Sequence, residues 1–235
     1  MQEQTFRFKS FSVKQGQCAM KVNTDGVLLG AWADVTQAKN ILDIGTGTGA
    51  IALMTAQRNQ HAEIDAIDID ETAYLQAKDN FANSPWSDRL HAYHSSLQDF
   101  STDKKYDLII SNPPYFINDY KADDHQKNIA RHSISLSYQD LIEGIHTLLS
   151  DKGKACLVLP VFNVTSLGLI ANQANLYLTR CADVVAVEGK APYLALIQLT
   201  REGKTFSKET IIIQDKAGHF RSEYKSLTAD FYLKF

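Results

Sequence analysis

The stretch SNPPYF follows YDLII, which reads as a buried strand. Proline fixes φ and has no N–H to donate, so the strand cannot continue through Pro113 and Pro114. The residue before a proline is pushed into an extended conformation, which holds the Asn112 amide in one direction. The pattern therefore predicts a rigid amide at the end of a strand, with two aromatic rings, Tyr115 and Phe116, beside it.

Such an amide suits chemistry on the exocyclic amine of a base. The lone pair of that amine is delocalised into the ring, so two acceptors aimed at its N–H bonds would favour tetrahedral geometry. The Asn112 side-chain oxygen and the Pro113 carbonyl can be these preorganised acceptors. Tyr115 would stack on a flipped base, and Phe116 would wall the pocket. A tight loop with packed aromatics is the alternative interpretation of this motif alone.

The stretch LDIGTGTGA places Gly45, Gly47 and Gly49 between an expected strand and an expected helix. Glycine permits positive φ and a close approach of the backbone to a ligand. The helix that begins near Ala50 directs its N-terminal amides at the same place, beyond the carboxyl ends of the strands. The turn therefore predicts a cofactor site at these three glycines.

Two cofactors fit the spacing of this turn. Gly45, Gly47 and Ala50 also satisfy G-x-G-x-x-A, which is typical of dinucleotide-binding turns. Asp43, however, places a carboxylate before the first glycine, where a pyrophosphate is unfavourable and a cation is tolerated. S-adenosylmethionine (SAM) carries an ammonium and a sulfonium and no phosphate. The motif therefore favours SAM and leaves a dinucleotide as the competitor.

Two further stretches are expected to complete the cofactor site. Asp68 ends the second expected strand, where an acid accepts hydrogen bonds from ribose hydroxyls, and Asp70 is better placed to cap the next helix. After the third strand, HSSLQDF offers Ser96, the backbone N–H of Leu97, and Asp99 as partners for the adenine amine. The spacing leaves all three open.

Strands and helices alternate from residue 40 onward, and this order must position the motifs. Seven segments read as strands: NILDIG, AEIDAIDID, LHAYHSS, YDLIIS, GKACLVLP, LYLTRCADVVAVE and PYLALIQLT. Strand–helix alternation predicts a Rossmann-like α/β fold with a mostly parallel, seven-stranded sheet. The linker GKAP is short enough for an antiparallel hairpin of the last two strands at the sheet edge.

The 235 residues, 44% hydrophobic with a net charge of −3, predict a single domain over 1–235. We expect no transmembrane helix and no signal peptide, because neither an 18-residue apolar run nor a basic-then-apolar start is present. The three cysteines are scattered and the histidines lack ligand spacing. We therefore expect reduced thiols, no metal site, a cytoplasmic location and a monomer.

Both ends of the chain are basic and rich in aromatic residues. Residues 201–235 contain seven Lys and Arg against five acids, and residues 1–35 carry their basic residues near the N-terminus. We expect both segments to cover the open end of the sheet and to contact RNA, with Arg221 and Lys225 as candidate contacts. Solvated lysines beside ordinary core aromatics are the alternative.

Together the motifs resemble class I SAM-dependent methyltransferases that act on amino nitrogens. ILDIGTGTG resembles their first motif and NPPYF their fourth. CAMKVNTDGVLLGAWA, NSPWSDRL, ARH, LVLP and EYKSLTADFYLKF extend the resemblance, over nearly the whole chain, to the bacterial tRNA1(Val) (adenine-37) 6-amino methyltransferase family. This resemblance implies SAM as methyl donor, tRNA as partner, and the adenosine 3′ of the anticodon as target.

The resemblance also implies roles for single residues. It implies SAM contacts at Asp43, Gly45, Gly47 and Asp68, and amine contacts at Asn112, Pro113 and Tyr115. KVNTDG resembles the segment over the methionine end of SAM, so Thr24 and Asp25 are candidate contacts or, alternatively, the N-cap of the next helix.

Two departures concern Ser96, where many relatives have an acid, and Tyr193, where many have a basic residue. Four other functions stay open from the residues alone. They are a protein glutamine methyltransferase, another nucleic-acid amino methyltransferase, a non-catalytic SAM- or RNA-binding module, and a dinucleotide-dependent oxidoreductase.

Overall fold

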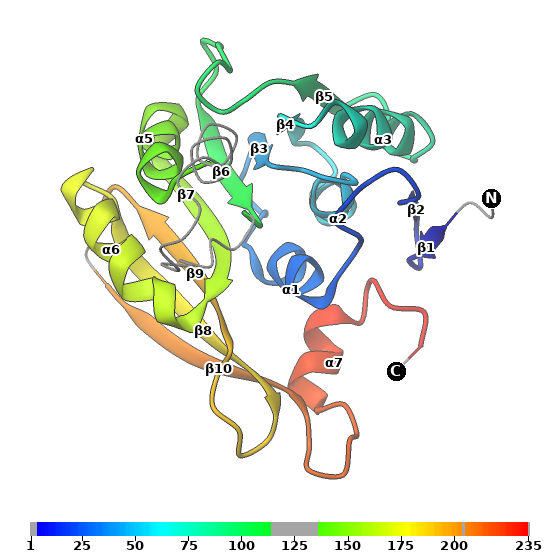
Figure 1. The fold of residues 1–235 in the computed structure, drawn as a ribbon, viewed down its shortest axis with the longest axis vertical. Helices are drawn as coiled ribbons and strands as arrows, with labels where there is room; N and C mark the ends of the chain where they lie inside the picture. The colour runs from blue at the N-terminus through cyan, green and yellow to red at the C-terminus, as the bar shows by residue number, and fades with distance from the viewer. Residues whose placement is uncertain (1–3, 114–135, 204, 235) are drawn as a thin grey trace, which may run out of the picture.

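The computed structural model describes residues 4–113, 136–203 and 205–234. Its main sheet has the strand order β10-β8-β9-β7-β6-β3-β4-β5 (Figure 1). Only β9 runs antiparallel to its neighbours within this described sheet. The strands are β3 (Asn40–Ile44), β4 (Glu63–Asp68), β5 (Leu90–His94), β6 (Tyr106–Ser111), β7 (Leu149–Pro160), β8 (Tyr177–Val187), β9 (Leu194–Thr200) and β10 (Ser207–Gln214).

The predicted Rossmann-like, mostly parallel fold is confirmed, with one correction to the sheet. The described part of the chain forms eight strands in this sheet rather than seven, and the β8–β9 hairpin is not at its edge. β10 lies outside the hairpin and pairs parallel with β8. Only the second half of β10 is buried, at Ile211 and Ile213, so its polar first half concealed the strand in the sequence.

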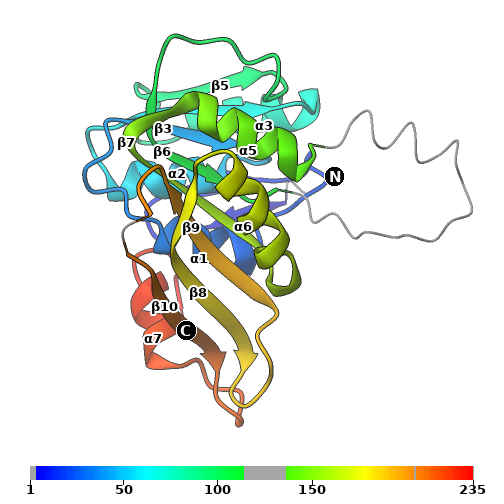
Figure 2. The same cartoon turned by 90° about the vertical axis from the view of Figure 1, so that its left-hand side faces the viewer.

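Helices cover both faces of the sheet and give it two separate cores. α1 (Thr24–Trp32), α2 (Ala50–Arg58) and α3 (Glu71–Ala82) contribute to one core, and α5 (Tyr138–Leu148) and α6 (Val164–Gln173) to the other. Figure 2 shows α5 and α6 in front of the strands. Adjacent strand residues point to opposite faces, so Ile41 joins the first core and Leu42 the second.

Local signals explain where several helices begin. Asp70 caps α3 through the Thr72 N–H, as its position before ETAYLQAK predicts. Ser137 and Asp140 form a reciprocal capping box at the start of α5. In the described residues, no helix has the length and apolar character needed to cross a bilayer.

The two ends of the chain pack against each other beside the sheet. The N-terminal hairpin β1 (Thr5–Arg7) and β2 (Ser12–Lys14) lies near the tail that follows α7 (Ser222–Thr228) (Figure 1). Phe8 stacks on Phe11 with centroids 4.5 Å apart, and meets Phe231 edge-on at 6.3 Å. All three rings are buried. These three terminal aromatics are therefore core residues, which agrees with the alternative interpretation of the terminal aromatics given above.

Candidate functional site

The register of three parallel strands brings the predicted motifs to one edge. Ile44 of β3 pairs with Ser111 of β6, so the next residues, Gly45 and Asn112, leave the sheet side by side. The Ser111 hydroxyl donates to the Ile44 carbonyl at 2.8 Å and ties the two strand ends together. On the other side of β3, Asp68 ends β4. The order along the edge is therefore Asn112, Gly45, Asp68.

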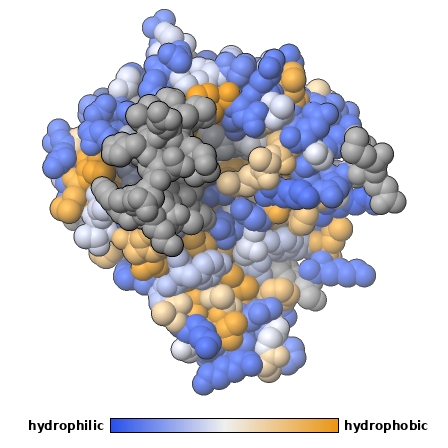
Figure 3. Space-filling model, viewed as in Figure 1, coloured by the Kyte–Doolittle hydropathy of each residue, from blue (hydrophilic) through white to orange (hydrophobic). Residues whose placement is uncertain are grey.

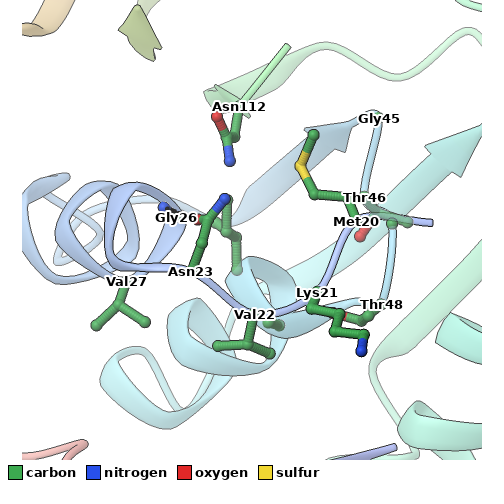
Figure 4. Close-up of a pocket in the computed structure, with 13 residues that line it drawn as sticks. Met20, Lys21, Val22, Asn23, Gly26, Val27, Gly45, Thr46, Thr48 and Asn112 are labelled. Atoms are coloured by element: carbon green, nitrogen blue, oxygen red, sulfur yellow. Dashed lines mark hydrogen bonds between the residues drawn. The ribbon is translucent and has the colours of Figure 1, made fainter. Parts of the chain in front are cut away.

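A cavity of about 540 Å³ lies along this edge. It is bordered by Gly45, Gly47, Asp68, Ser96, Leu97 and Asn112, among others. A second cavity of about 50 Å³ adjoins it between the glycine turn, the segment 20–23 and Asn112 (Figure 4). Ligand pockets usually measure about 300–1,000 Å³, so the larger cavity can hold a nucleoside-sized cofactor.

The three glycines of the turn divide into two kinds. Gly45 and Gly47 have φ of 69° and 56°, and a Cβ on either would meet no atom within 4 Å. They present bare backbone to the cavity. Gly49 also has positive φ, at 80°, but a Cβ there would come within 2.5 Å of the Phe81 ring. Gly49 therefore packs the turn against α3 and does not line either cavity.

Asp68 holds the turn as well as lining the cavity. Its Oδ2 accepts a hydrogen bond from the Gly47 N–H at 2.8 Å, and its Oδ1 accepts one from the Asp70 N–H at 2.9 Å. Burial raises the pKa of the Asp68 carboxyl, although these two backbone bonds oppose the rise. The carboxylate is thus fixed in direction before any ligand binds.

Asp43 lies beneath the turn rather than at the cavity. It is 1% exposed, and its Oδ2 accepts a hydrogen bond from the Thr46 hydroxyl at 2.6 Å. The Oδ1 atom accepts no hydrogen bond of normal geometry from the described residues. Burial raises the pKa of Asp43 to about 7, and the charge of Asp68 adds to the rise. Asp43 therefore shapes the turn from below.

The residues after β5 are arranged around a local turn. The Ser96 hydroxyl donates to Asp99 at 2.6 Å and accepts from the Asp99 N–H at 3.1 Å. Leu97 is buried, and its side chain would collide with any Cβ on Gly144 of α5. Its backbone N–H donates to no described residue. This arrangement leaves the Leu97 N–H and the second oxygen of Asp99 as groups that can face a ligand.

Asn112 is half-buried at the junction of the two cavities, and Pro113 behind it is buried. Its side chain makes no hydrogen bond to a described residue. In Figure 4 its amide points toward the start of α1, where a Cβ on Gly26 would lie 3.6 Å from Nδ2. Tyr115 and Phe116 lie outside the described residues.

In the segment before α1, the residue that caps the helix and lines the cavity is not the one that was predicted. The N-cap is Asn23, whose Oδ1 accepts from the Gly26 N–H at 2.9 Å, so neither Thr24 nor Asp25 is the cap. Asn23 and Met20 line the cavity beside Asn112, whereas Thr24 does not (Figure 4). Asn23 thus joins the site where Thr24 was expected. Its place before the helix pattern TDGVLLGAW was the available signal.

Arg221 and Lys225 lie at α7, away from both cavities. Arg221 precedes the helix and lies 3.7 Å from Glu188 and from Glu223. Lys225 is exposed. The structure does not bring these two residues to the cofactor cavity, so any contact they make with a substrate is a peripheral one.

The charge of the larger cavity distinguishes between the two cofactors. Among its described lining residues, Asp68, Asp70 and Asp99 are acidic, and none is Lys or Arg. This donor set suits the ammonium, sulfonium and ribose of SAM, and is unfavourable for the pyrophosphate of a dinucleotide. No group of His, Cys, Asp and Glu in the described residues could hold a metal ion.

Comparison with known proteins agrees with this geometry. Residues 18–160 match the family model of the Methyltransferase small domain. The chain is similar to a tRNA1(Val) (adenine(37)-N6)-methyltransferase of Parabacteroides distasonis, with 45% identity over 97% of this chain and 98% of the relative. The protein of the same name from Histophilus somni (strain 2336) is 40% identical over 99% of both chains.

Solved structures share the fold at low sequence identity. A predicted O-methyltransferase from Agrobacterium tumefaciens superposes with a TM-score of 0.67 at 17% identity, covering 88% of this chain and 96% of that one. A ribosomal protein L11 methylase from Lactobacillus delbrueckii subsp. bulgaricus gives 0.58 at 17% identity, covering 81% and 84%. By its full-length relatives and its matched domain, the chain belongs to the tRNA1(Val) (adenine(37)-N6)-methyltransferase family.

Proposed function

We propose that this protein transfers the methyl group of SAM to the exocyclic 6-amino group of adenosine 37 in tRNA1(Val). The observation that carries the proposal is the junction of Asn112 with the glycine turn. An amide without a hydrogen bond to the described residues meets a cavity whose chemistry suits SAM. The names of the full-length relatives supply the nucleotide and the tRNA.

In the proposed reaction, SAM supplies an electrophilic methyl carbon. The Asn112 side-chain oxygen and the Pro113 carbonyl accept hydrogen bonds from the two N–H bonds of the adenine amine. This arrangement favours tetrahedral nitrogen and directs its lone pair at the methyl carbon. The N–C bond forms as the S–C bond breaks, and the alkylated amine loses its proton to water. Tyr115 and Phe116 are proposed to hold the flipped base.

The cofactor is proposed to extend from Asn112 to Ser96 along the strand ends. Gly45 and Gly47 let the backbone approach it, and Asp68 accepts hydrogen bonds from the ribose. The Leu97 N–H and the Ser96–Asp99 turn bind the adenine. Asp43, Gly49 and Thr24 line neither cavity, so no direct contact with the cofactor is proposed for them. We propose that Asp43 and Gly49 act by shaping the glycine turn, and that Thr24 acts by placing the start of α1.

The basic ends of the chain, within 1–35 and 201–235, are proposed to contact the tRNA. Lys225 is exposed, and Arg221 shares its guanidinium with two glutamates. Lys225 is therefore the better candidate for a phosphate contact. Arg221 is proposed to link the β8–β9 tip, through Glu188, to the start of α7, through Glu223. We propose that the enzyme acts as a cytoplasmic monomer. Sedimentation of the protein with and without tRNA tests the oligomeric state.

Methyl transfer from labelled SAM tests the proposed function directly. The protein is incubated with separate pools of tRNA, DNA and protein, and the labelled product is digested and identified. We expect label in tRNA as N6-methyladenosine, and none in a tRNA1(Val) transcript with guanosine at position 37. Label in glutamine or DNA, or binding of SAM without transfer to any pool, would overturn the proposal.

A further inference from the structure

The edge of the sheet continues beyond Asn112 and carries two exposed aromatic rings. β7 runs parallel to β6 and extends past it, because Ser111 pairs with Leu157 and β7 ends at Pro160. Phe162 follows at 73% exposure. Tyr193, at 42% exposure, precedes β9 directly beside it. Both rings therefore stand at the edge that holds Asn112.

The backbone that presents these rings is fixed on both sides. The Val161 N–H donates to the Tyr193 carbonyl at 3.3 Å and joins the two strand ends. The Asn163 side chain is buried and donates to the Tyr138 hydroxyl of α5 at 2.8 Å. Phe162 thus lies between two anchored residues while its own ring stays in solvent. A ring held in this way can stack on a base at little further cost in entropy.

Basic side chains occupy the next part of the same edge. The tip between β8 and β9 carries Lys190, and the loop after β10 carries Lys216. The two tips touch, because a Cβ on Gly189 would lie 3.5 Å from the Lys216 side chain. Both lysines are exposed, and neither forms a salt bridge with a described residue. Two ammonium groups are therefore available for anions.

The sheet twists, so this edge curves from the middle of the molecule to its lower end. The tips after β8 and β10 reach the bottom of Figures 1 and 2. In the space-filling view of this face, the lower part mixes hydrophilic and apolar residues (Figure 3). β8 lies three strand spacings from β6 and β10 lies four, roughly 15 Å and 20 Å across the sheet. Both tips also extend beyond the level of Ser111, so several nucleotides are needed to reach them from Asn112.

We propose that this edge is a second RNA-contact surface, in which Phe162 and Tyr193 stack on unpaired bases next to the methylated adenosine. Lys190 and Lys216 contact phosphates further along the same RNA chain. Single-stranded RNA loops are recognised by aromatic stacking combined with phosphate contacts, and these two groups follow one another along the edge. The inference rests on the proposed function, because it takes the adenosine at Asn112 as its origin.

The opposite edge of the sheet supplies matched controls. Single exposed aromatic rings are common on protein surfaces. The test must therefore distinguish an effect of the ring's position from an effect of its exposure alone. Phe206 is 56% exposed before β10, and Tyr177 is 36% exposed at the start of β8. Both lie at the amino end of parallel strands, far from Asn112. They match Phe162 and Tyr193 in side-chain type, are somewhat less exposed, and lie at the other edge of the sheet.

The first test measures tRNA1(Val) binding by fluorescence anisotropy and methyl transfer in the presence of SAM. The double variant Phe162→Ala, Tyr193→Ala is compared with Phe206→Ala, Tyr177→Ala. We expect the first to bind tRNA about tenfold to 100-fold more weakly, as one or two stacked bases are lost. The control should change affinity by less than twofold. SAM affinity by calorimetry should be unchanged in both, which shows that the variants are folded.

The second test examines the lysines through salt dependence. Lys190→Glu with Lys216→Glu should flatten the slope of log affinity against log salt by about one to two, since each phosphate contact releases counterions. The control pair, Lys39→Glu with Lys152→Glu, reverses two exposed lysines at the amino ends of β3 and β7. Its slope should change less than that of the first pair.

The outcomes separate this inference from the proposed function. If the unmodified protein transfers no methyl group to tRNA, the proposed function fails first. If it methylates tRNA and the Phe162, Tyr193 variant binds tRNA within twofold of it, the second contact surface does not exist. Equal losses in both aromatic double variants would also overturn the inference, because the effect would not depend on the edge.

Discussion

The two sides of the reaction site use their polar side chains in opposite ways. On the cofactor side, Asp68 holds the Gly47 amide, and Ser96 and Asp99 hold each other. Beneath them Asp43 holds Thr46. On the acceptor side, the Asn112 amide has no hydrogen bond to the described residues. The cofactor side is tied together by its own groups, whereas the Asn112 amide is unpaired among the described residues.

This difference has a physical reason. A cofactor with a fixed shape is bound best by a backbone turn that is already rigid, and the carboxylates supply that rigidity. An amine that must change geometry during reaction needs an acceptor with no other partner, held by the rigid Pro113 that follows it. Substitutions on the cofactor side should therefore alter binding and stability together. Substitution of Asn112 should alter turnover alone.

The largest expected effect is at Asn112. Asn112→Ala removes the side-chain acceptor and leaves the glycine turn unchanged, so methyl transfer should fall on the order of 10²–10³-fold. SAM affinity by calorimetry and the thermal midpoint should stay as in the unmodified protein. Near-normal turnover with intact SAM binding would mean that the motif is only a rigid loop. A large loss of stability would contradict the contrast between the two sides.

Gly49→Ala should have the next largest effect, on stability. The added Cβ would collide with Phe81 at 2.5 Å while φ stays positive, so we expect a loss of about 1–3 kcal/mol in unfolding free energy. Gly47→Ala is the matched control, because it shares the positive φ but faces open cavity. Urea denaturation should rank Gly49→Ala as the less stable variant. The reverse ranking would show that the turn does not depend on contact with α3.

Asp68→Ala should weaken SAM binding by about 1–3 kcal/mol, because it removes a ribose acceptor and releases the Gly47 amide. Unlike Asn112→Ala, it should also lower the thermal midpoint. Calorimetry with SAM and a thermal melt of the same sample measure both effects, and titration with NAD serves as the cofactor control. Unchanged SAM affinity in the folded variant would remove Asp68 from the site.

The smallest expected effect is a pH dependence from Asp43. Its pKa in the folded protein is raised to about 7, above the ordinary value of about 3.9 in the unfolded chain. The protonated form is therefore favoured by folding, and its contribution to stability is full below about pH 4 and lost as pH rises through about 7. Asp43→Asn keeps an acceptor for Thr46 and should lack this loss. The thermal midpoint of the unmodified protein should therefore fall relative to that of Asp43→Asn as pH rises from 5 to 8. A constant difference between the two midpoints would contradict the prediction.

The sequence by itself determined the fold class, the SAM-type turn and the placement of Asn112 beside it. Each depends on short-range rules: alternation of strand and helix, glycines after a strand, and prolines that end one. β10 was not evident, because its buried residues occupy only half of a polar segment and its partner, β8, lies some 20 residues earlier.

Only the tertiary structure decided which residues of each motif face the cavity. Gly49 resembles Gly45 and Gly47 in sequence, yet it faces Phe81 of a helix some 30 residues away. Asp43 lies one residue before the end of β3 and Asp68 ends β4, yet Asp43 is buried beneath the turn whereas Asp68 lines the cavity. Spacing along the chain fixes the conformation of a residue, whereas the direction it faces depends on what packs against it from elsewhere in the chain.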